Sequence, residues 1–150
     1  MKIFQKLGFV LMFVGISTSV ALANDKTQED TVRALVAALE ANNQLEVSDE
    51  TRDQLYDLYA DDIIMTHTAF DFVIDSKATL RSQSEHFAGF NRDVTLTIED
   101  IMMGDKIAIV KIHRIGEQKD MDGNWSAGEK SSIMAIRFNE YGLIERIWNF

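Results

Sequence analysis

The spacing of apolar residues predicts a long helix at the start of the domain. Over residues 27–43, apolar side chains recur at the i, i+3, i+4, i+7 spacing of one helix face, at Val32, Leu35, Val36 and Leu39. Thr27 is a suitable N-cap, and acidic residues follow it in the first turn, where negative charge suits the helix dipole. The pattern therefore predicts a helix with one buried face.

Two shorter helices are predicted further along the chain. Residues 48–60 begin with a serine that can cap a helix, followed by two acidic residues. Residues 76–89 also begin with a serine and end at a glycine, a common helix stop. Leu80 and Phe87 are predicted to lie on the buried side of this third helix.

Alternating apolar and polar residues predict strands in the rest of the chain. The predicted strands are residues 63–68, 70–74, 94–99, 107–115, 130–138 and 143–150. In the first of them, Ile63, Met65 and His67 share one face, because successive side chains of a strand point to opposite sides. The polar segment 120–128 is predicted to be a long hairpin loop.

The order of these elements predicts the fold class. Helices collected first and an antiparallel meander collected last are typical of an α+β fold, with three helices packed on one face of a strongly curved sheet. Such a sheet half closes around its own concave side, which is a natural place for a pocket.

The first 23 residues have the three parts of a secretory signal peptide. Lys2 and Lys6 are followed by the apolar run 7–16 and by the A-x-A cleavage pattern of residues 21–23. A membrane anchor is the alternative, but the run is shorter than the ~20 residues that span a bilayer. We therefore expect cleavage, a single domain over residues 24–150, and a periplasmic or secreted protein.

The charge and cysteine content exclude several functions. Loss of Lys2 and Lys6 with the signal peptide takes the formal net charge from −9 to −11. This charge argues against nucleic acid and, after cleavage, against anionic membranes as partners. The chain has no cysteine, which excludes disulfides, thiolate nucleophiles and cysteine-based metal sites. We expect no cofactor.

Three segments resemble the SnoaL-like group of the nuclear transport factor 2 superfamily. They are LYADDIIMTHT, GDKIAIVKIHR and SSIMAIRFNEYGLIERIWNF, in this order and at this spacing. The resemblance covers nearly all of residues 27–150 and implies a cone-shaped α+β barrel, commonly paired into homodimers through the sheet. It does not specify a function, because the superfamily includes isomerases, polyketide cyclases, dehydratases and proteins without catalysis.

Ketosteroid isomerase, an enzyme of this superfamily, uses an aspartate base with a tyrosine and a protonated aspartate as oxyanion donors. The resemblance implies that these positions correspond to His67, Leu35 and Met134 here. Neither replacement for a donor can hydrogen-bond usefully, so an enolate would lack its usual stabilisation. We therefore do not expect ketosteroid isomerase activity.

His67 is the main candidate for a catalytic residue, because an imidazole on an apolar wall can act as a general acid or base. The alternative is a structural or solvated histidine.

His113 is a second candidate if its face of strand 107–115 lines the cone. His67 and His113 would then converge in a pair that resembles the two-histidine site of scytalone dehydratase. Lys111 lies on the same face as His113 and favours a solvated position instead. His86 is expected beside the buried face of the third helix, at the boundary between its buried and exposed sides, because it is rotated by ~100° from Phe87. We expect no metal site, since the histidines lack ligand spacing.

Further residues are candidate ligand contacts. For Met65, Tyr56, Tyr59 and Met134 the alternative is core packing, and for Trp148 it is a dimer interface. Trp125 is expected in a loop. The function expected from these observations is binding of a small, largely apolar organic molecule, with cofactor-independent proton transfer of the isomerase, cyclase or dehydratase type if the protein is an enzyme. The alternative is a non-catalytic binding or homodimeric assembly module.

Overall fold

The computed structural model describes the chain from residue 17 to residue 150, and its side chains from residue 27. The helices are α1 (Ser17–Asn42), α2 (Asp49–Tyr56) and α3 (Lys77–His86), with a short 3-10 turn at Thr68–Phe70. The strands are β1 (Tyr59–His67), β2 (Phe72–Ile74), β3 (Asn91–Gly104), β4 (Ile107–Lys119), β5 (Trp125–Phe138) and β6 (Ile144–Asn149). Most of the predicted signal peptide, residues 1–16, lies outside the described residues. No helix in the described part is long and apolar enough to cross a bilayer.

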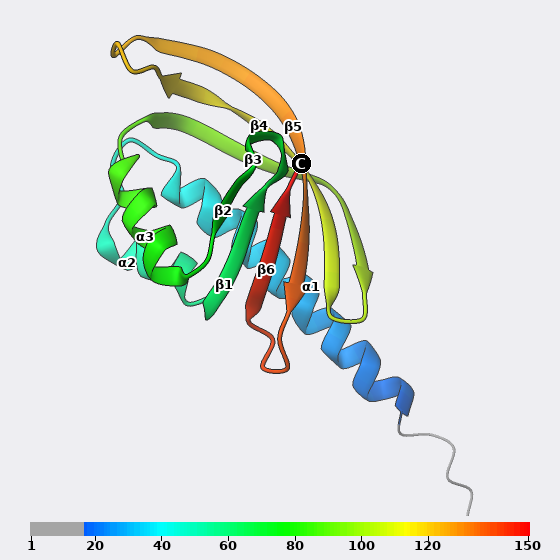
Figure 1. The fold of residues 1–150 in the computed structure, drawn as a ribbon. Coiled ribbons are helices and arrows are strands. Elements are labelled where there is room, and N and C mark those ends of the chain that lie inside the picture. Colours follow the sequence, from blue (N-terminus) through cyan, green and yellow to red (C-terminus); the bar gives the residue numbers. More distant parts are fainter. Residues whose placement is uncertain (1–16) are drawn as a thin grey trace, which may run out of the picture.

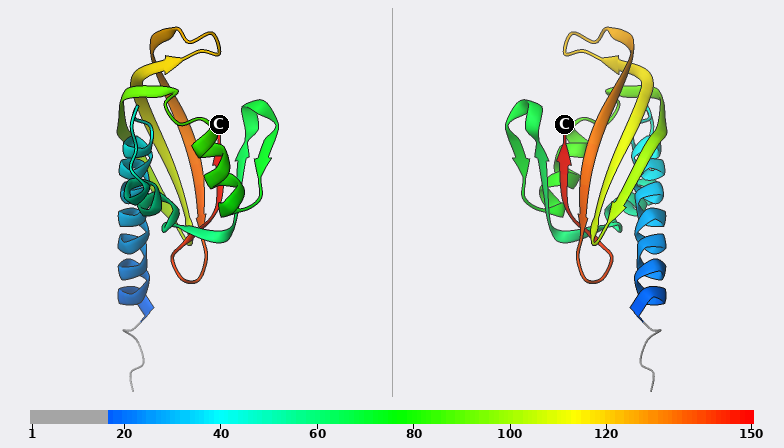
Figure 2. Two further views of the ribbon diagram at one scale, coloured as in Figure 1. Left: turned by 90° about the vertical axis from the view of Figure 1, so that its left-hand side faces the viewer. Right: turned by 90° about the vertical axis from the view of Figure 1, so that its right-hand side faces the viewer.

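The strands form one six-stranded sheet in the order β2-β1-β6-β5-β4-β3. Only β1 and β6 run parallel; the other neighbouring strands are antiparallel. The sheet is strongly curved, with α1 packed against β3 and β4 and α3 packed against β1 (Figures 1 and 2). Its two edges do not meet, so the cone is open. The predicted α+β fold, with three helices against a curved and mostly antiparallel sheet, is confirmed.

The two short helices begin where their serines predict. The Ser48 hydroxyl accepts a hydrogen bond from the Thr51 backbone N–H, and the Ser76 hydroxyl accepts one from Thr79, both at 3.2 Å. The other boundaries differ from prediction. Thr27 lies inside α1, which begins at Ser17, and α3 ends before Phe87, whose side chain is 54% exposed. The prediction of a buried Phe87 was wrong because the helix ends too early to turn this ring toward the core.

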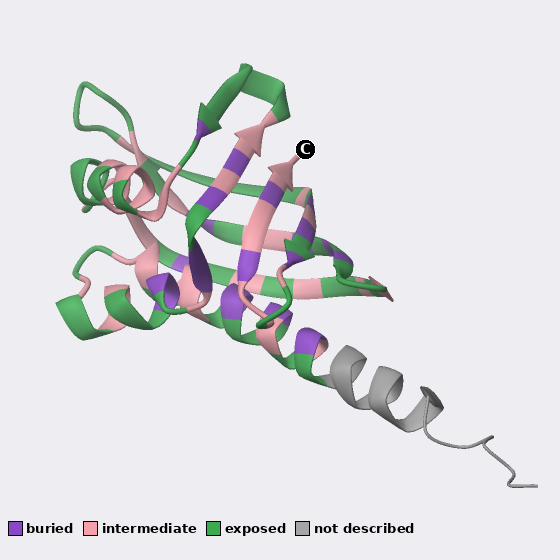
Figure 3. Ribbon diagram, turned by 60° about the horizontal axis from the view of Figure 1, so that its bottom comes forward, coloured by how far each residue is buried: buried purple, intermediate pink, exposed green. Residues whose placement is uncertain are grey.

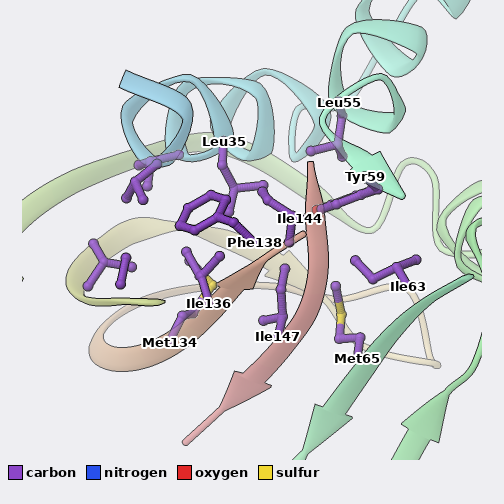
Figure 4. Close-up of a cluster of buried hydrophobic side chains, with 14 of the residues drawn as sticks. Leu35, Leu55, Tyr59, Ile63, Met65, Met134, Ile136, Phe138, Ile144 and Ile147 are labelled. Atoms are coloured by element: carbon purple, nitrogen blue, oxygen red, sulfur yellow. The ribbon is translucent and has the colours of Figure 1, made fainter. Parts of the chain in front are cut away.

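The hydrophobic core lies between α1 and the concave side of the sheet. Val32, Leu35 and Val36 of α1 are buried there, as the helical spacing predicts. Figure 4 shows Leu35 beside Phe138 and Ile136, with the side chains of β6 and β1 completing the cluster. Figure 3 shows the burial alternating with exposure along the strands. The core fixes which face of each strand points inward.

The long hairpin of β4 and β5 differs most from prediction. Trp125 begins β5 instead of lying in a loop, and the turn of the hairpin is confined to residues 120–124. The Arg92 guanidinium lies 4.2 Å from the centroid of the Trp125 ring. Residues 126–131 of β5 are exposed. This part of β5 therefore lacks the alternation of apolar and polar residues from which strands are predicted, and residues 126–128 fall in the predicted loop 120–128.

Candidate functional site

The concave face of the sheet provides the hollow part of the molecule. Along β4, Ala108, Val110 and Ile112 are buried and Arg114 follows them on the same face. The alternate positions, including Ile109 and Lys111, are exposed. Because one face of an antiparallel sheet packs on the core, this alternation identifies the inward face of β4.

A first cavity of about 190 Å³ lies among the three helices and the start of the sheet. Three of the predicted ligand contacts, Tyr56, Tyr59 and Met65, line it. Leucines from all three helices supply most of the remaining apolar wall, at Leu39, Leu55 and Leu80. Polar groups come from residues of α1, α2, α3 and the segments that follow them, at Asn42, Asn43, Gln44, Arg52, Ser84 and Asn91.

The two tyrosines bring hydroxyl groups to this cavity. Burial raises the pKa of Tyr59 far above its ordinary value and also raises the pKa of Tyr56, so both phenols remain protonated donors at neutral pH. The Tyr56 hydroxyl is buried and makes no hydrogen bond of ordinary geometry among the described residues. The Ser84 side chain is close enough to act as a hydrogen-bonding neighbour and lowers the pKa of Tyr56, against the larger effect of burial. A ligand atom that accepts a hydrogen bond from the Tyr56 hydroxyl would complete its hydrogen bonding.

A second cavity of about 320 Å³ opens between α1 and the inner face of β3, β4 and β5. It shares the lining residues Leu39, Asn43 and Asn91 with the first cavity, so the two cavities are neighbours. Met134, another predicted ligand contact, lies in its wall. The other lining residues are Leu96, Ile112, Arg114, Gln118, Lys130 and Ser132.

His67 lies at the end of β1, on the same face as Met65 but outside the lining of both cavities. It is half-buried, its ring centroid is 6.2 Å from that of Phe72, and it makes no hydrogen bond among the described residues. Burial lowers the pKa of His67, and the positive charge of Lys130 lowers it further. The imidazole is therefore neutral at pH 7 and able to accept a proton.

His113 lies on the outward face of β4. Its Nδ1 is 3.3 Å from the Ser131 hydroxyl, which in turn lies 3.4 Å from a Glu99 carboxylate oxygen. Glu99 also pairs with Lys111 at 2.9 Å. The structure therefore does not bring His67 and His113 together, and the solvated alternative describes His113.

Trp148 also lies away from the hollow. It pairs with Thr66 and Ala135 in the sheet, on the face opposite the buried Ile147. The Arg146 guanidinium stands 5.4 Å from its ring centroid. As a candidate ligand contact, Trp148 is placed on the convex surface and not in the wall of either cavity.

The positions that correspond to the oxyanion donors hold apolar side chains deep in the fold. Leu35 is fully buried in the core, and Met134 is buried beside the second cavity. Among residues 27–150, no group of three or more histidine, aspartate or glutamate side chains is arranged to hold a metal ion. Chemistry in the hollow would therefore depend on the tyrosine hydroxyls, the amides and the basic groups.

No protein-family model and no curated protein matches the chain. Solved structures do match its fold. A candidate SnoaL-like polyketide cyclase from Jannaschia sp. superposes with a TM-score of 0.70 at 10% identity, covering 84% of this chain and 85% of that one. A candidate polyketide cyclase from Xanthomonas campestris gives 0.64 at 16% identity, covering 84% and 90%.

A third similar structure is a protein with a ketosteroid isomerase-like fold from Catenulispora acidiphila, solved in complex with trimethylamine. Its TM-score is 0.64 at 14% identity, and the match covers 81% of this chain and 84% of that one. These likenesses show that the chain has the fold of SnoaL-like and ketosteroid isomerase-like proteins, which is the fold that the sequence segments predict.

Sequence analysis missed Arg114, Lys130 and Asn91 as lining residues. A usable signal was present for Arg114. The set Ala108, Val110, Ile112 is more uniformly apolar than residues 107, 109 and 111 of the opposite face, which identifies the inward face and places Arg114 on it. Nothing comparable pointed to Asn91, whose position depends on the start of β3 meeting the end of α1.

Proposed function

We propose that the protein is an exported, non-catalytic binding protein for a small, largely apolar organic molecule. The observation that carries the proposal is the pair of neighbouring cavities, which are lined by leucine, methionine and tyrosine side chains together with amide groups. Small-molecule sites are typically concave and mostly apolar, with a few polar groups that orient the ligand. The Catenulispora protein of the same fold was solved in complex with trimethylamine, which supports the view that this fold can hold a small organic molecule.

Octanol tests this proposal, because it offers an apolar chain and one hydroxyl. We expect it to bind and to shift the NMR signals of Met65 and Tyr59. Tyr56→Phe removes one neutral hydrogen bond and should weaken octanol binding about threefold to tenfold. Tyr141→Phe is the matched control, since Tyr141 is 80% exposed and lines neither cavity. Absence of octanol binding to the folded protein would contradict the proposal.

Proton-transfer catalysis is the second candidate function, and His67 favours it. Its neutral imidazole lies on the concave face beside Met65, where it can act as a general base. Two observations favour binding without catalysis. No described acid or hydroxyl lies within hydrogen-bond distance of His67, and the ring lies outside both cavities. A screen of isomerase, cyclase and dehydratase substrates with His67→Gln as control decides between them.

Export is tested at the N-terminus of the mature protein. We expect the chain isolated from the periplasm or the medium to begin at Asn24, after cleavage by signal peptidase at the A-x-A pattern. Intact mass spectrometry measures this directly. A full-length chain that remains in the cytoplasm would exclude export.

A further inference from the structure

Two basic residues face each other in the wall of the second cavity. Arg114 of β4 and Lys130 of β5 are directly opposed partners in the antiparallel ladder, and both line the cavity. Side chains at such positions have Cβ atoms about 5 Å apart, and like charges there are destabilising. A carboxylate of the protein or another anion bound between the two side chains would offset the repulsion.

The described part of the protein does not supply that carboxylate. Arg114 and Lys130 take part in none of the ion pairs formed within 4.0 Å among residues 27–150. Glu129 precedes Lys130 in the chain but pairs with Ile115, on the opposite face of the hairpin. Lys106, Lys119 and Arg146 also form none of these ion pairs, but they line neither cavity, whereas Arg114 and Lys130 stand together in the wall of the second.

Arg114 is also held in place. One of its guanidinium nitrogens donates a 3.0 Å hydrogen bond to the Asn91 side-chain oxygen. The Asn91 amide nitrogen donates in turn to the Asn43 side-chain oxygen at 3.3 Å. This chain of amides crosses from β3 to the end of α1 and orients the guanidinium without neutralising it. Asn91 is therefore a positioning residue for Arg114.

The two cavities differ in charge. The first is lined by leucines, Met65, the tyrosines and several amides, and its basic side chain, Arg52, is paired with Asp49. Arg114, Lys130 and Ser132 stand in the wall of the second cavity. The two cavities share the lining residues Leu39, Asn43 and Asn91. We propose that the ligand is an amphipathic carboxylate, with its apolar chain in the first cavity and its anionic head between Arg114 and Lys130. This inference rests on the proposed binding function and specifies its ligand class.

The test compares octanoate with octanol and octylammonium, which differ mainly in their head groups. Titration calorimetry should show octanoate binding at least about tenfold more tightly than octanol, the size of effect expected for charge-assisted hydrogen bonds. Added salt should weaken octanoate binding and leave octanol binding nearly unchanged, because only the ionic contribution is screened.

Variants then locate the head group. Arg114→Gln should remove most of the advantage of octanoate, and Lys130→Gln, at an exposed position, should reduce it about threefold. Lys106→Gln is the matched control, because it removes one positive charge from the exposed turn between β3 and β4, away from both cavities. If Arg114→Gln does not fold, Lys130→Gln still tests the site, since the loss of an exposed side chain should change stability little.

The outcomes separate the two proposals. Octanol binding as tightly as octanoate, or octylammonium binding more tightly, would overturn the anionic head-group site and leave the binding function intact. A folded protein that binds none of the three compounds would overturn the binding function, and the head-group site with it. Octanoate preference that survives both cavity variants would likewise overturn the assignment to Arg114 and Lys130.

Discussion

The Glu40 carboxylate of α1 accepts a 2.6 Å hydrogen bond from the backbone N–H of Leu96 on β3. One turn later, the Gln44 amide both donates to the Val94 carbonyl at 2.8 Å and accepts from the Val94 N–H at 3.3 Å. β3 is an edge strand, whose outer N–H and C=O groups have no neighbouring strand to pair with. The end of α1 thus takes the place of a further strand along this edge.

We predict that Glu40→Ala lowers the free energy of unfolding by about 1–3 kcal/mol, because it leaves the half-buried Leu96 N–H without its acceptor. Urea denaturation measures the change. Glu46→Ala is the matched control: Glu46 is exposed and makes none of the described hydrogen bonds or ion pairs, so its loss should change stability by less than about 0.5 kcal/mol. Equal effects of the two substitutions would show that the contact to Leu96 does not stabilise the edge.

Two glycines that face each other across β4 and β5 give the second prediction. A Cβ on Gly116 would lie 2.9 Å from a Val94 methyl carbon and 3.0 Å from the Val94 Cα, whereas a Cβ on its partner Gly128 would meet nothing within 4 Å. Gly116→Ala should therefore destabilise the protein by about 1–3 kcal/mol through overpacking against backbone. Gly128→Ala, the same change across the ladder, should leave stability unchanged or slightly raised. Thermal unfolding of both variants would show the contrast; similar melting temperatures would contradict it.

The titration of His67 gives the third prediction. Burial and the charge of Lys130 both lower the pKa of this imidazole. Lys130→Gln removes the repulsion, so the NMR-measured pKa of His67 should rise toward its ordinary value of about 6.5. Lys106→Gln, which removes a distant charge, should leave it unchanged. If the pKa of His67 is the same in the wild-type protein and in Lys130→Gln, burial alone causes the shift.

The same shift has a consequence for stability. Because the folded-state pKa of His67 is lower than that of the unfolded chain, the unfolded state binds its proton at a higher pH than the folded state does. This difference makes the free energy of unfolding fall as the pH drops below about 6.5 and level off below the folded-state pKa. His67→Gln should remove this part of the pH dependence, which urea denaturation at a series of pH values would measure.

The sequence was sufficient for the fold but not for the site. Two local patterns predicted the fold: the helical spacing of Val32, Leu35 and Val36, and the alternation along β4. Both patterns arise because one side of each element is buried in the same core. The second cavity depends on contacts that no local pattern encodes. Arg114 meets Asn91 and Asn43 only because β3, β4 and the end of α1 converge in space. His67 was singled out because a strand pattern identifies a face, but it does not locate the cavity along that face.

The convex face gives the last prediction. A row of residues crosses it from β3 to β6, formed by Met102, Ile109, Ala135 and Trp148, which are neighbours in the strand register. Ile109 is 42% exposed and Met102 is 63% exposed. We propose that this row pairs with a second copy of the chain, because exposed apolar residues that are neighbours in a sheet can form an interface between subunits.

Ile109→Glu should convert the proposed homodimer into a monomer, because it places two like charges in an apolar interface. Sedimentation velocity at several protein concentrations measures the mass. Met121→Glu is the matched control, since Met121 is 88% exposed at the β4–β5 turn and lies outside the row. A wild-type protein that sediments as a monomer at every concentration would exclude the homodimer. A dimer that survives Ile109→Glu would place the interface on another surface of the molecule.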